Sequence, residues 1–486
     1  MHLLPHSLAL SCLLSIATQQ AVAAPSAPAT RRAAAPQTIP LVRRSRSSHN
    51  STEWLLSQKH GIESKYTSSG QSRKRANGLN LLTNQNADSS YYGSIAVGTP
   101  AISYNVILDT GSADLWLAAS SSGLSSNSLS GISMFNSSAS SSFKDLETNF
   151  SISYGSGSAR GTLGQDVVQF AGFEVQKQTF GVVTQVSDNL LTSPVSGLMG
   201  LGFSTIASSG ATPFWEALAN ADRTLDSPLM AFQLTRFIDV AKAQTLEPGG
   251  TFNLGAVNSS LFTGDIDYQS IPSGEEGYWI QELAGLAVNG ESVSLPSGSS
   301  SYAAIDTGTT LVGGPDQYIS ALYAQIPGSQ ALTGENAGYY TYPCSTNVNV
   351  TMRFGSSSIS WPISNADFLL TQASATLCVG AFFSLDTSGT SAPPWIIGDT
   401  FLKNVYTVFR SSPASVGFAT LSSTATAMNG ALGSAPSATI GSVVASVTGT
   451  PTTDRSSTTS NPARRLTASV GVVALAVSAL GSLFAL

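Results

Sequence analysis

The chain has 486 residues, with 22 Lys and Arg against 28 Asp and Glu, which gives a formal net charge of −6. All four histidines lie in a leading region that a secreted enzyme would lose on maturation: His2, His6, His49 and His60. The remainder has no Ser-His-Asp or Cys-His pair, no His-ligated zinc and no P-loop pattern. If the chain is an enzyme, we therefore expect carboxylates as its catalysts, without a metal ion, cofactor or nucleic-acid partner.

Residues 1–24 have the pattern of a secretory signal peptide. An apolar stretch over 8–16 runs into the small-residue sequence AVAAP, so cleavage is expected after Ala24. A buried core strand is the alternative, and the N-terminal position makes it the weaker one.

Residues 25–75 are strongly basic. They carry ten Lys and Arg against two Glu, a net charge of +8, whereas residues 76–486 carry twelve Lys and Arg against 26 acids, a net charge of −14. The two parts should attract each other at neutral pH. A solvated basic tail is the alternative. In a secreted enzyme we expect an inhibitory prosegment, with Arg73–Arg75 as a processing site and maturation below about pH 5, where carboxylates begin to titrate.

The central part contains one motif twice. NVILDTGSADLW, which contains Asp109, is followed 197 positions later by YAAIDTGTTLVG, which contains Asp306. About a tenth of one Asp-Thr-Gly is expected by chance in a chain of this length. Asp109 is followed after 91 residues by Gly200 in GLMGLG, and Asp306 after 92 residues by Gly398 in WIIGDT. A half-chain is therefore repeated, which predicts two similar lobes.

Short runs of β-forming residues punctuated by Gly, such as FEVQKQTFGVV, dominate this central part. Helices are expected only over 213–221 and 315–326, each beginning at a Pro. We therefore predict a mostly-β, bilobal architecture with lobes at 76–264 and 265–422 around a central cleft.

The C-terminal end has two parts. Residues 423–465 are rich in Ser, Thr, Ala, Gly and Pro, so they cannot bury a core and are expected to form an exposed, O-glycosylated stalk. Residues 466–486 are apolar to the last residue. A transmembrane helix is the alternative, but no basic residue follows to hold a cytoplasmic end. A glycosylphosphatidylinositol (GPI) signal, with attachment at Ser456 or Ser457, is favoured and predicts membrane attachment through a lipid.

Cysteines and sequons agree with an extracellular location. Because secretion implies an oxidising compartment, we expect Cys344 and Cys378 to form one disulfide, while Cys12 leaves with the signal peptide. We predict an anchored or secreted monomer. Asn-X-Ser/Thr sequons predict N-glycosylation at Asn136, Asn149, Asn258 and Asn349.

From about Tyr91 to Ala419 the chain resembles the pepsin-like aspartic proteases of the secreted fungal type. The resemblance rests on motifs in the family's order: YYGSIAVGTP, ILDTGSADLW, YGSGSARGTLGQD, SGLMGLG, AIDTGTT, WIIGDTFLKNVYTVF and VGFA. The anchored, Ser/Thr-rich ending resembles the yapsin-like cell-surface branch. One departure is visible. The family often has a disulfide after the first active-site strand, but here that stretch reads LAASSSGLSSNS.

The resemblance implies a secreted aspartic endopeptidase that hydrolyses polypeptides at acid pH, with Asp109 and Asp306 meeting across a shared cleft. Two adjacent carboxylates cannot easily both ionise, so they hold one proton over a wide acid range. The ionised member can activate a bridging water while the other binds the peptide carbonyl, and these roles belong to the coupled pair.

By the same resemblance, further residues support the two loops. The glycines would donate their N–H groups to the carboxylates, the first threonines would bind across to the opposite loop, and the outer hydroxyls would hold each carboxylate. These residues are Thr110, Gly111, Ser112, Thr307, Gly308 and Thr309.

A β-hairpin is predicted where the sequence reads Tyr-Gly-Ser-Gly. The resemblance identifies it as the flap that closes over bound peptide, with Trp116 supporting the flap tyrosine. The flap residues are Tyr154, Gly155, Ser156 and Gly157.

Lys65 and Tyr66 resemble the family's prosegment pair, whose lysine lies between the two catalytic carboxylates. Lys65 is therefore predicted to plug the cleft of the precursor. The yapsin-like ending and the acidic net charge also suggest cleavage beside basic residues.

Two other classes of protein remain alternatives. A pepsin-like lobe pair that has lost its activity would be a cell-wall binding or structural protein, but none of the expected catalytic residues is lost. An actin-like or phosphatase Asp loop would need phosphate-binding glycines and metal ligands, which the sequence lacks.

Overall fold

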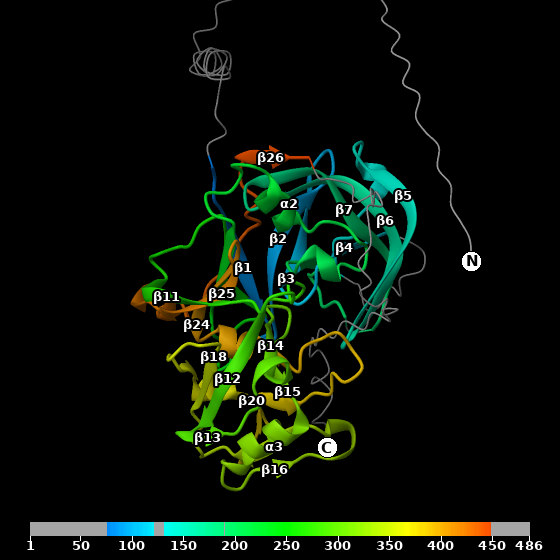
Figure 1. The fold of residues 1–486 in the computed structure, drawn as a ribbon. Helices are drawn as coiled ribbons and strands as arrows, with labels where there is room; N and C mark the ends of the chain where they lie inside the picture. Colours follow the sequence, from blue (N-terminus) through cyan, green and yellow to red (C-terminus); the bar gives the residue numbers. More distant parts are fainter. Residues whose placement is uncertain (1–74, 121–130, 189, 449–486) are drawn as a thin grey trace, which may run out of the picture. The chain divides into compact units, whose positions relative to one another are not determined.

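The computed structural model describes residues 75–120, 131–188 and 190–448 (Figure 1). By its internal contacts the chain divides into two compact units, residues 1–71 and 72–486. All described residues belong to the second unit.

Several predicted features lie outside the described residues. They are the signal peptide, the prosegment apart from Arg75, and the apolar C-terminal signal. Lys65 and Tyr66 are among them, as are the predicted attachment residues Ser456 and Ser457. These assignments stay predictions.

The largest sheet has fourteen strands, which pair in the order β11-β25-β24-β9-β10-β1-β2-β3-β8-β4-β7-β6-β5, with β26 added beside β7. In chain order its strands are β1 (Gly78–Gln85), β2 (Ser90–Val97), β3 (Ile102–Asp109), β4 (Leu115–Ala118), β5 (Lys144–Tyr154), β6 (Gly157–Phe170), β7 (Phe173–Val186), β8 (Gly197–Gly200), β9 (Leu229–Leu234), β10 (Leu246–Leu254), β11 (Phe262–Ser270), β24 (Val405–Ser411), β25 (Ala414–Leu421) and β26 (Ala445–Val447).

Two further sheets belong to the second half of the chain. An eight-stranded sheet contains β12 (Ile280–Val288), β13 (Glu291–Val293), β14 (Tyr302–Ile305), β15 (Val312–Gly314), β18 (Val350–Phe354), β19 (Trp361–Ile363), β22 (Phe382–Ser384) and β23 (Trp395–Ile397). A four-stranded sheet contains β16 (Gln330–Ala331), β17 (Tyr340–Pro343), β20 (Leu369–Gln372) and β21 (Leu377–Gly380).

Helices are short in the described part of the chain. The α-helices are α2 (Phe214–Asn220), α3 (Asp316–Ala324), α4 (Asn365–Phe368), α5 (Asp399–Leu402) and α6 (Ser423–Thr426). The 3-10 helices are η1 (Ser137–Ala139), η2 (Ser204–Ile206), η3 (Gly298–Ser301) and η4 (Gly334–Asn336). The two predicted helices are confirmed as α2 and α3, which begin after Pro213 and Pro315. The mostly-β prediction is also confirmed.

Residue alternation explains why these segments form strands. In β18 the apolar side chains of Val350, Met352 and Phe354 are buried, while the intervening Thr351 and Arg353 are half-buried. A period of two places alternate side chains on one face of a sheet. The apolar face packs into the core and the other face can remain polar.

The repeated motif corresponds to a repeated pair of parallel strands. β3 lies parallel to β8, so that Asp109 is in register with Gly200. β14 lies parallel to β23, with Ile305 in register with Ile397. The apolar-apolar-Gly segments found at nearly equal distances in the sequence are therefore the neighbours of the two Asp-bearing strands, which explains the two-lobe repeat.

The two halves share the largest sheet. β24 pairs with β9, where Thr407 is opposite Phe232, and β25 then pairs with β11. C-terminal strands thus complete the sheet that contains the N-terminal strands (Figure 1). The predicted boundary between residues 264 and 265 falls inside β11. The repeat in the sequence does not mark the ends of this strand, because β11 pairs with β25, which is far away along the chain.

Residues 423–448 form a strap that packs onto the largest sheet. In α6, Ala425 is fully buried. Farther on, the hydroxyl of Thr439 accepts a hydrogen bond of 2.8 Å from the Leu81 N–H of β1. The strap ends in β26, which pairs in parallel with β7 and buries Val447 (Figure 1).

The strap shows that the first part of the predicted stalk, 423–448, makes contacts with the sheet although most of its residues stay exposed or half-buried. The strap has few apolar side chains to bury, so backbone hydrogen bonds attach much of it to the sheet. The Gly172 N–H donates to the Ile440 carbonyl at 2.8 Å, and the Val444 N–H donates to the Gly172 carbonyl at 2.7 Å. Such bonds require an available sheet edge, which composition does not reveal. The rest of the predicted stalk, 449–465, lies outside the described residues.

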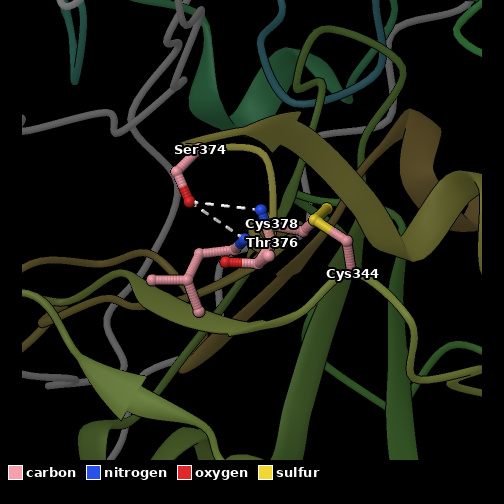
Figure 2. Close-up of a disulfide and its surroundings, with 5 residues drawn as sticks. Cys344, Ser374, Thr376 and Cys378 are labelled. Carbon is pink, nitrogen blue, oxygen red and sulfur yellow. Dashed lines mark hydrogen bonds between the residues drawn. A yellow bond between two sulfur atoms is a disulfide. The ribbon is translucent and has the colours of Figure 1, made fainter.

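The predicted disulfide between Cys344 and Cys378 is confirmed. It joins the residue after β17 to β21, and these strands already pair with each other. Figure 2 shows the turn beside it, where the Ser374 hydroxyl accepts hydrogen bonds from the N–H groups of Thr376 and Leu377, at 3.4 and 3.1 Å. The bridge therefore ties the segment after β17 to β21, beside this connection.

None of the helices in the described part of the chain is long and apolar enough to cross a membrane.

Ending the chain after Met428 instead of after Thr448 is expected to lower the melting temperature by about 3 °C or more. The shorter chain loses several backbone hydrogen bonds, each contributing about 1 kcal/mol, and the burial of Val447. Differential scanning calorimetry of the two truncated proteins measures the difference. Equal melting temperatures would show that the strap does not stabilise the fold.

Candidate active site

The first Asp-Thr-Gly motif follows directly on a buried strand. β3 ends at Asp109, whose carboxylate accepts hydrogen bonds from the Gly111 N–H at 2.8 Å and the Ser112 hydroxyl at 2.5 Å. The loop therefore wraps around its own carboxylate.

The second motif repeats this arrangement. Asp306 follows β14, and its carboxylate accepts hydrogen bonds from the Gly308 N–H at 2.8 Å and the Thr309 hydroxyl at 2.6 Å. The two carboxylates thus have matching donors from equivalent residues.

The glycines of the loops show that the two carboxylates meet. A Cβ atom placed on Gly111 would lie 2.5 Å from Oδ2 of Asp306, and one placed on Gly308 would lie 2.3 Å from Oδ1 of Asp109. Both positions therefore require glycine. Each loop passes directly beside the carboxylate of the other.

Reciprocal hydrogen bonds between two threonines fix this contact. The Thr110 hydroxyl donates to the Ile305 carbonyl at 2.8 Å and accepts from the Thr307 N–H at 3.0 Å. The Thr307 hydroxyl donates to the Leu108 carbonyl at 2.6 Å and accepts from the Thr110 N–H at 3.1 Å. The four bonds form a closed set, so neither loop can shift without breaking bonds on both sides.

The carboxylate pair is almost completely buried, with Asp109 0% and Asp306 1% exposed. Burial raises the pKa of Asp109 well above its ordinary value, and the adjacent charge of Asp306 raises it further, against the opposing bonds from Ser112 and Gly111. The pair therefore retains a proton at pH values where an exposed aspartate is ionised.

The predicted flap sequence forms a tight hairpin between β5 and β6. Tyr154 is in register with Gly157, so Gly155 and Ser156 make a two-residue turn. Gly157 has a φ of +149°, and a Cβ there would lie 2.7 Å from the Cβ of Ser187. Glycine is therefore needed at this position for both backbone conformation and space.

The hairpin tyrosine is held near the carboxylates. Tyr154 is 7% exposed, and its hydroxyl accepts a hydrogen bond of 2.8 Å from Nε1 of Trp116. Burial raises the pKa of Tyr154 well above its ordinary value, and the charge of Asp109 raises it further. The phenol therefore lies within electrostatic reach of the catalytic loops.

An apolar pocket lies between the hairpin and the Asp306 loop. The residues that line it are Ile107, Trp116, Tyr154, Ser156, Leu190, Leu191, Leu198 and Gly308. None of these described residues carries a charge. Because Gly308 is one of them, the pocket lies directly beside the carboxylates.

Sequence reasoning missed several residues of this region. Leu190 and Leu191 lie in a connection without a motif, and only the position of Leu198 inside SGLMGLG could have drawn attention to the pocket. Tyr278 was missed as well. Burial raises its pKa, and the charges of Asp306 and Asp109 raise it further, so it belongs to the same electrostatic environment.

The sequon asparagines lie at or near the surface. Asn136, Asn149 and Asn349 are exposed. Asn258 is half-buried, and its side-chain oxygen accepts hydrogen bonds from the N–H and hydroxyl of Ser260, at 3.1 and 2.7 Å. Glycosylation at these four residues stays a prediction.

A mostly-β fold in which two Asp-Thr-Gly loops meet defines the class of aspartic peptidases. The chain belongs to the family of eukaryotic aspartyl proteases, whose sequence model matches residues 90–421. The resemblance to pepsin-like enzymes is thereby confirmed, and the chain is an aspartic-type endopeptidase.

Named relatives agree with this assignment. The chain is 44% identical to major aspartyl peptidase 1 of Cryptococcus neoformans over 398 residues, which cover 76% of this chain and 80% of that protein. It is 36% identical to an aspartic protease of Phaffia rhodozyma, covering 76% and 86% of the two chains. It is 32% identical to pepsin A of Bos taurus, covering 76% and 92%.

Asp109→Asn is expected to make the folded protein more stable at neutral pH. A raised pKa means that the folded state binds the proton more tightly than the unfolded chain, so the stability from this group is complete below an ordinary pKa of about 3.9 and is lost as pH rises through the raised value. The Asp109→Asn variant has no carboxyl group to ionise at this position, so it does not lose stability there as the pH rises.

Thermal unfolding from pH 3 to pH 7 measures the effect. The melting temperature of Asp109→Asn relative to wild type should increase with pH. A difference that is independent of pH would contradict the raised pKa of Asp109.

Proposed function

We propose that the chain is a secreted endopeptidase in which a water molecule between Asp109 and Asp306 attacks the peptide bond at acid pH. The observation that carries this proposal is the contact of Gly111 and Gly308 with the opposite carboxylates, which brings both acids to one place. The family assignment supplies the reaction class.

The shared proton provides an acid and a base at the same pH. Two adjacent carboxylates repel each other when both are ionised, so one keeps a proton while the other is charged. The charged member accepts a proton from the attacking water, and the protonated member donates a hydrogen bond to the peptide carbonyl oxygen. No covalent intermediate with the enzyme is needed. The individual roles of Asp109 and Asp306 belong to the coupled pair.

The surrounding hydrogen bonds hold the pair ready for this step. Ser112 and Thr309 occupy the outer oxygens of the two carboxylates, and this leaves the facing oxygens for the water and the substrate. The reciprocal hydrogen bonds of Thr110 and Thr307 maintain the separation of the two acids. Preorganisation of this kind removes the need for the site to rearrange during the reaction.

The hairpin around Tyr154 supports a role as a lid. Its tight two-residue turn can lie over a bound peptide and exclude bulk water, which strengthens the electrostatic interactions inside the site. The bond from Trp116 fixes the orientation of the tyrosine beside the turn of this lid.

The pocket beside the carboxylates favours an apolar substrate residue next to the scissile bond. A Lys or Arg side chain entering the pocket would leave its charge without a partner among the described lining residues. This argues against the hypothesis of cleavage beside basic residues at this subsite.

We also propose secretion, a basic prosegment whose Lys65 plugs the cleft of the precursor, and a GPI anchor at Ser456 or Ser457. The signal-peptide pattern, the charge difference between residues 25–75 and 76–486, and the apolar ending support these proposals. Release from cells by phosphatidylinositol-specific phospholipase C tests the anchor, and activity of a Lys65→Ala precursor at neutral pH tests the plug.

An inactive cell-wall protein is not favoured. Both aspartates, the flap tyrosine and the hydroxyls of Ser112 and Thr309 are present and hydrogen-bonded as a working pair would require.

The mature enzyme is expected to cleave a denatured protein near pH 4 and to be blocked by a pepstatin-type inhibitor. Asp306→Asn should lower the rate by about 1,000-fold, because the pair loses its general base and acid. Activity should fall toward neutral pH as the shared proton is lost.

Mass spectrometry of the peptide products measures this cleavage. The exposed control Asp265→Asn should cleave like wild type. Absent cleavage, or cleavage that resists the inhibitor, would refute the proposed mechanism.

A peptide library is expected to show a preference for Leu, Phe or Met next to the scissile bond, over Lys and Arg by about 100-fold or more in kcat/KM, because burial of an unpaired charge is costly. Leu191→Asp should reduce this ratio by providing a partner for a basic side chain. The exposed control Leu432→Asp should leave the ratio unchanged, and a wild-type preference for basic residues would show that the pocket does not select substrates.

A further inference from the structure

A buried ionic cluster lies in the same part of the fold as the Asp306 loop. Lys403 follows α5, and its Nζ lies 2.9 Å from Oδ2 of Asp88 and 2.9 Å from Oδ1 of Asp367. The Lys403 side chain is only 3% exposed. Arg236 binds Asp367 as well. Two cations therefore face two carboxylates inside the protein.

The opposite charges of the cluster shift the pKa values of their neighbours. Burial alone would lower the pKa of Lys403, but Asp367 and Asp88 raise it above its ordinary value. Burial alone would raise the pKa of Asp367, but Lys403 and Arg236 hold it below its ordinary value. Loss of one member would leave an uncompensated buried charge. Lys403 and Asp367 therefore each favour the ionised form of the other.

The carboxylate of Asp88 is also fixed from other directions. It accepts hydrogen bonds from Asn84 Nδ2 at 2.6 Å and from the N–H groups of Phe237 and Ile238, at 2.8 and 3.1 Å. Asp88 lies in the turn between β1 and β2, so Lys403 ties this turn to α5.

This turn contacts the Asp306 loop. Asp88 is followed by Ser89, whose carbonyl accepts a hydrogen bond of 2.7 Å from the Thr310 hydroxyl. Thr310 follows Thr309, which donates to the Asp306 carboxylate at 2.6 Å. A shift of the turn would therefore move Thr310. Thr310 is next to Thr309, whose hydroxyl binds the Asp306 carboxylate.

The helix bearing Lys403 contacts the same loop from the other side. The Asp399 N–H donates to the Thr309 carbonyl at 2.8 Å, and the Thr400 N–H donates to the Thr310 carbonyl at 2.9 Å. The Lys403 N–H closes the helix on the Asp399 carbonyl at 3.0 Å. The helix and the turn thus hold Thr309 and Thr310 between them, and Lys403 joins the two.

The Asp109 loop lacks the charged residue at the matching helix position. Lys403 lies five residues after Gly398, whereas the uncharged Thr205 lies five residues after the equivalent Gly200. The carboxyl of Asp399 is buried, and its Oδ1 has no hydrogen-bond partner in the described part of the chain. The ionic support therefore distinguishes one loop of the repeat from the other.

We infer that Lys403 is a positioning residue for the Asp306 loop, because its ammonium holds the turn before β2 and helix α5 against Thr309 and Thr310. The inference rests on the proposed role of Asp306 in catalysis. A catalytic group displaced by about 1 Å can cost a large factor in rate. Lys403 touches neither catalytic carboxylate, so it acts through the loop alone.

Lys403→Met removes the ammonium and keeps the length of the side chain. We expect kcat to fall by about tenfold or more while KM changes by less than about threefold, because the chemical step is affected more than substrate binding. Lys403→Arg should retain more than about a third of the wild-type kcat, since it keeps the charge. Thr310→Val should lower kcat by about threefold or more without a large change in melting temperature.

Two matched controls separate positioning from stability. Lys144→Met removes an exposed lysine and should keep the wild-type kcat and melting temperature. Leu286→Ala makes a cavity in the core of the eight-stranded sheet, and it should lower the melting temperature but keep kcat at temperatures where the protein is folded. Circular dichroism at the assay temperature verifies folding.

Wild-type kcat in folded Lys403→Met, or in Thr310→Val, would overturn the inference. If Lys403→Met does not fold, Asp88→Asn and Thr310→Val decide instead, and wild-type kcat in both would also overturn it. These outcomes differ from failure of the proposed function, in which the wild-type enzyme itself would not cleave or Asp306→Asn would remain active.

Discussion

The active centre depends on holding two buried carboxylates together although they repel each other when both are ionised. The exchange of hydrogen bonds between Thr110 and Thr307 opposes this repulsion, since it uses backbone groups of both loops that would otherwise be buried and unpaired. Burial raises the pKa of Asp109, and the adjacent charge of Asp306 raises it further. Stability near neutral pH is reduced at this point, and the proposed mechanism uses the proton that the pair retains.

The sheets are arranged so that this contact can form. Each Asp is delivered by a strand that lies parallel to a strand ending in apolar-apolar-Gly, and the glycine is needed because the returning loop passes against it. A Cβ on Gly200 would lie 2.4 Å from the backbone of Ala113, and one on Gly398 would lie 2.1 Å from the Thr309 carbonyl oxygen. The two halves then share the largest sheet, where β24 pairs with β9. A shared backbone ladder limits the relative movement of the two catalytic loops.

The two loops are similar but not equivalent. In the Asp306 loop, Thr310 binds Ser89 from the other half of the chain, and a buried ionic cluster lies behind that contact. Buried ion pairs contribute little net stability and can be costly, so they are better explained by the geometry that they impose. In this protein that geometry concerns the Asp306 loop. The two acids of the proposed catalytic pair therefore have different surroundings, although their loops are repeats of each other.

The sequence by itself determined the features that depend on local pattern. The Asp-Thr-Gly strands, the hairpin at Tyr154, the helices after Pro213 and Pro315, and the family could all be predicted, because strand alternation, turn glycines and motif spacing are properties of neighbouring residues. The disulfide followed from a count of the two cysteines that remain after the predicted signal peptide.

Only the tertiary structure decided the contacts that join distant segments. Composition predicted the stalk from residue 423, but it did not predict that β26 would pair with β7 at an available sheet edge. The salt bridges of Lys403 reach Asp88 across 315 positions of sequence, and neither residue lies in a pattern that marks it as buried. Edge pairing and charge compensation depend on which groups are brought together and removed from water, and this is settled by the packing of the whole chain rather than by any local stretch of sequence.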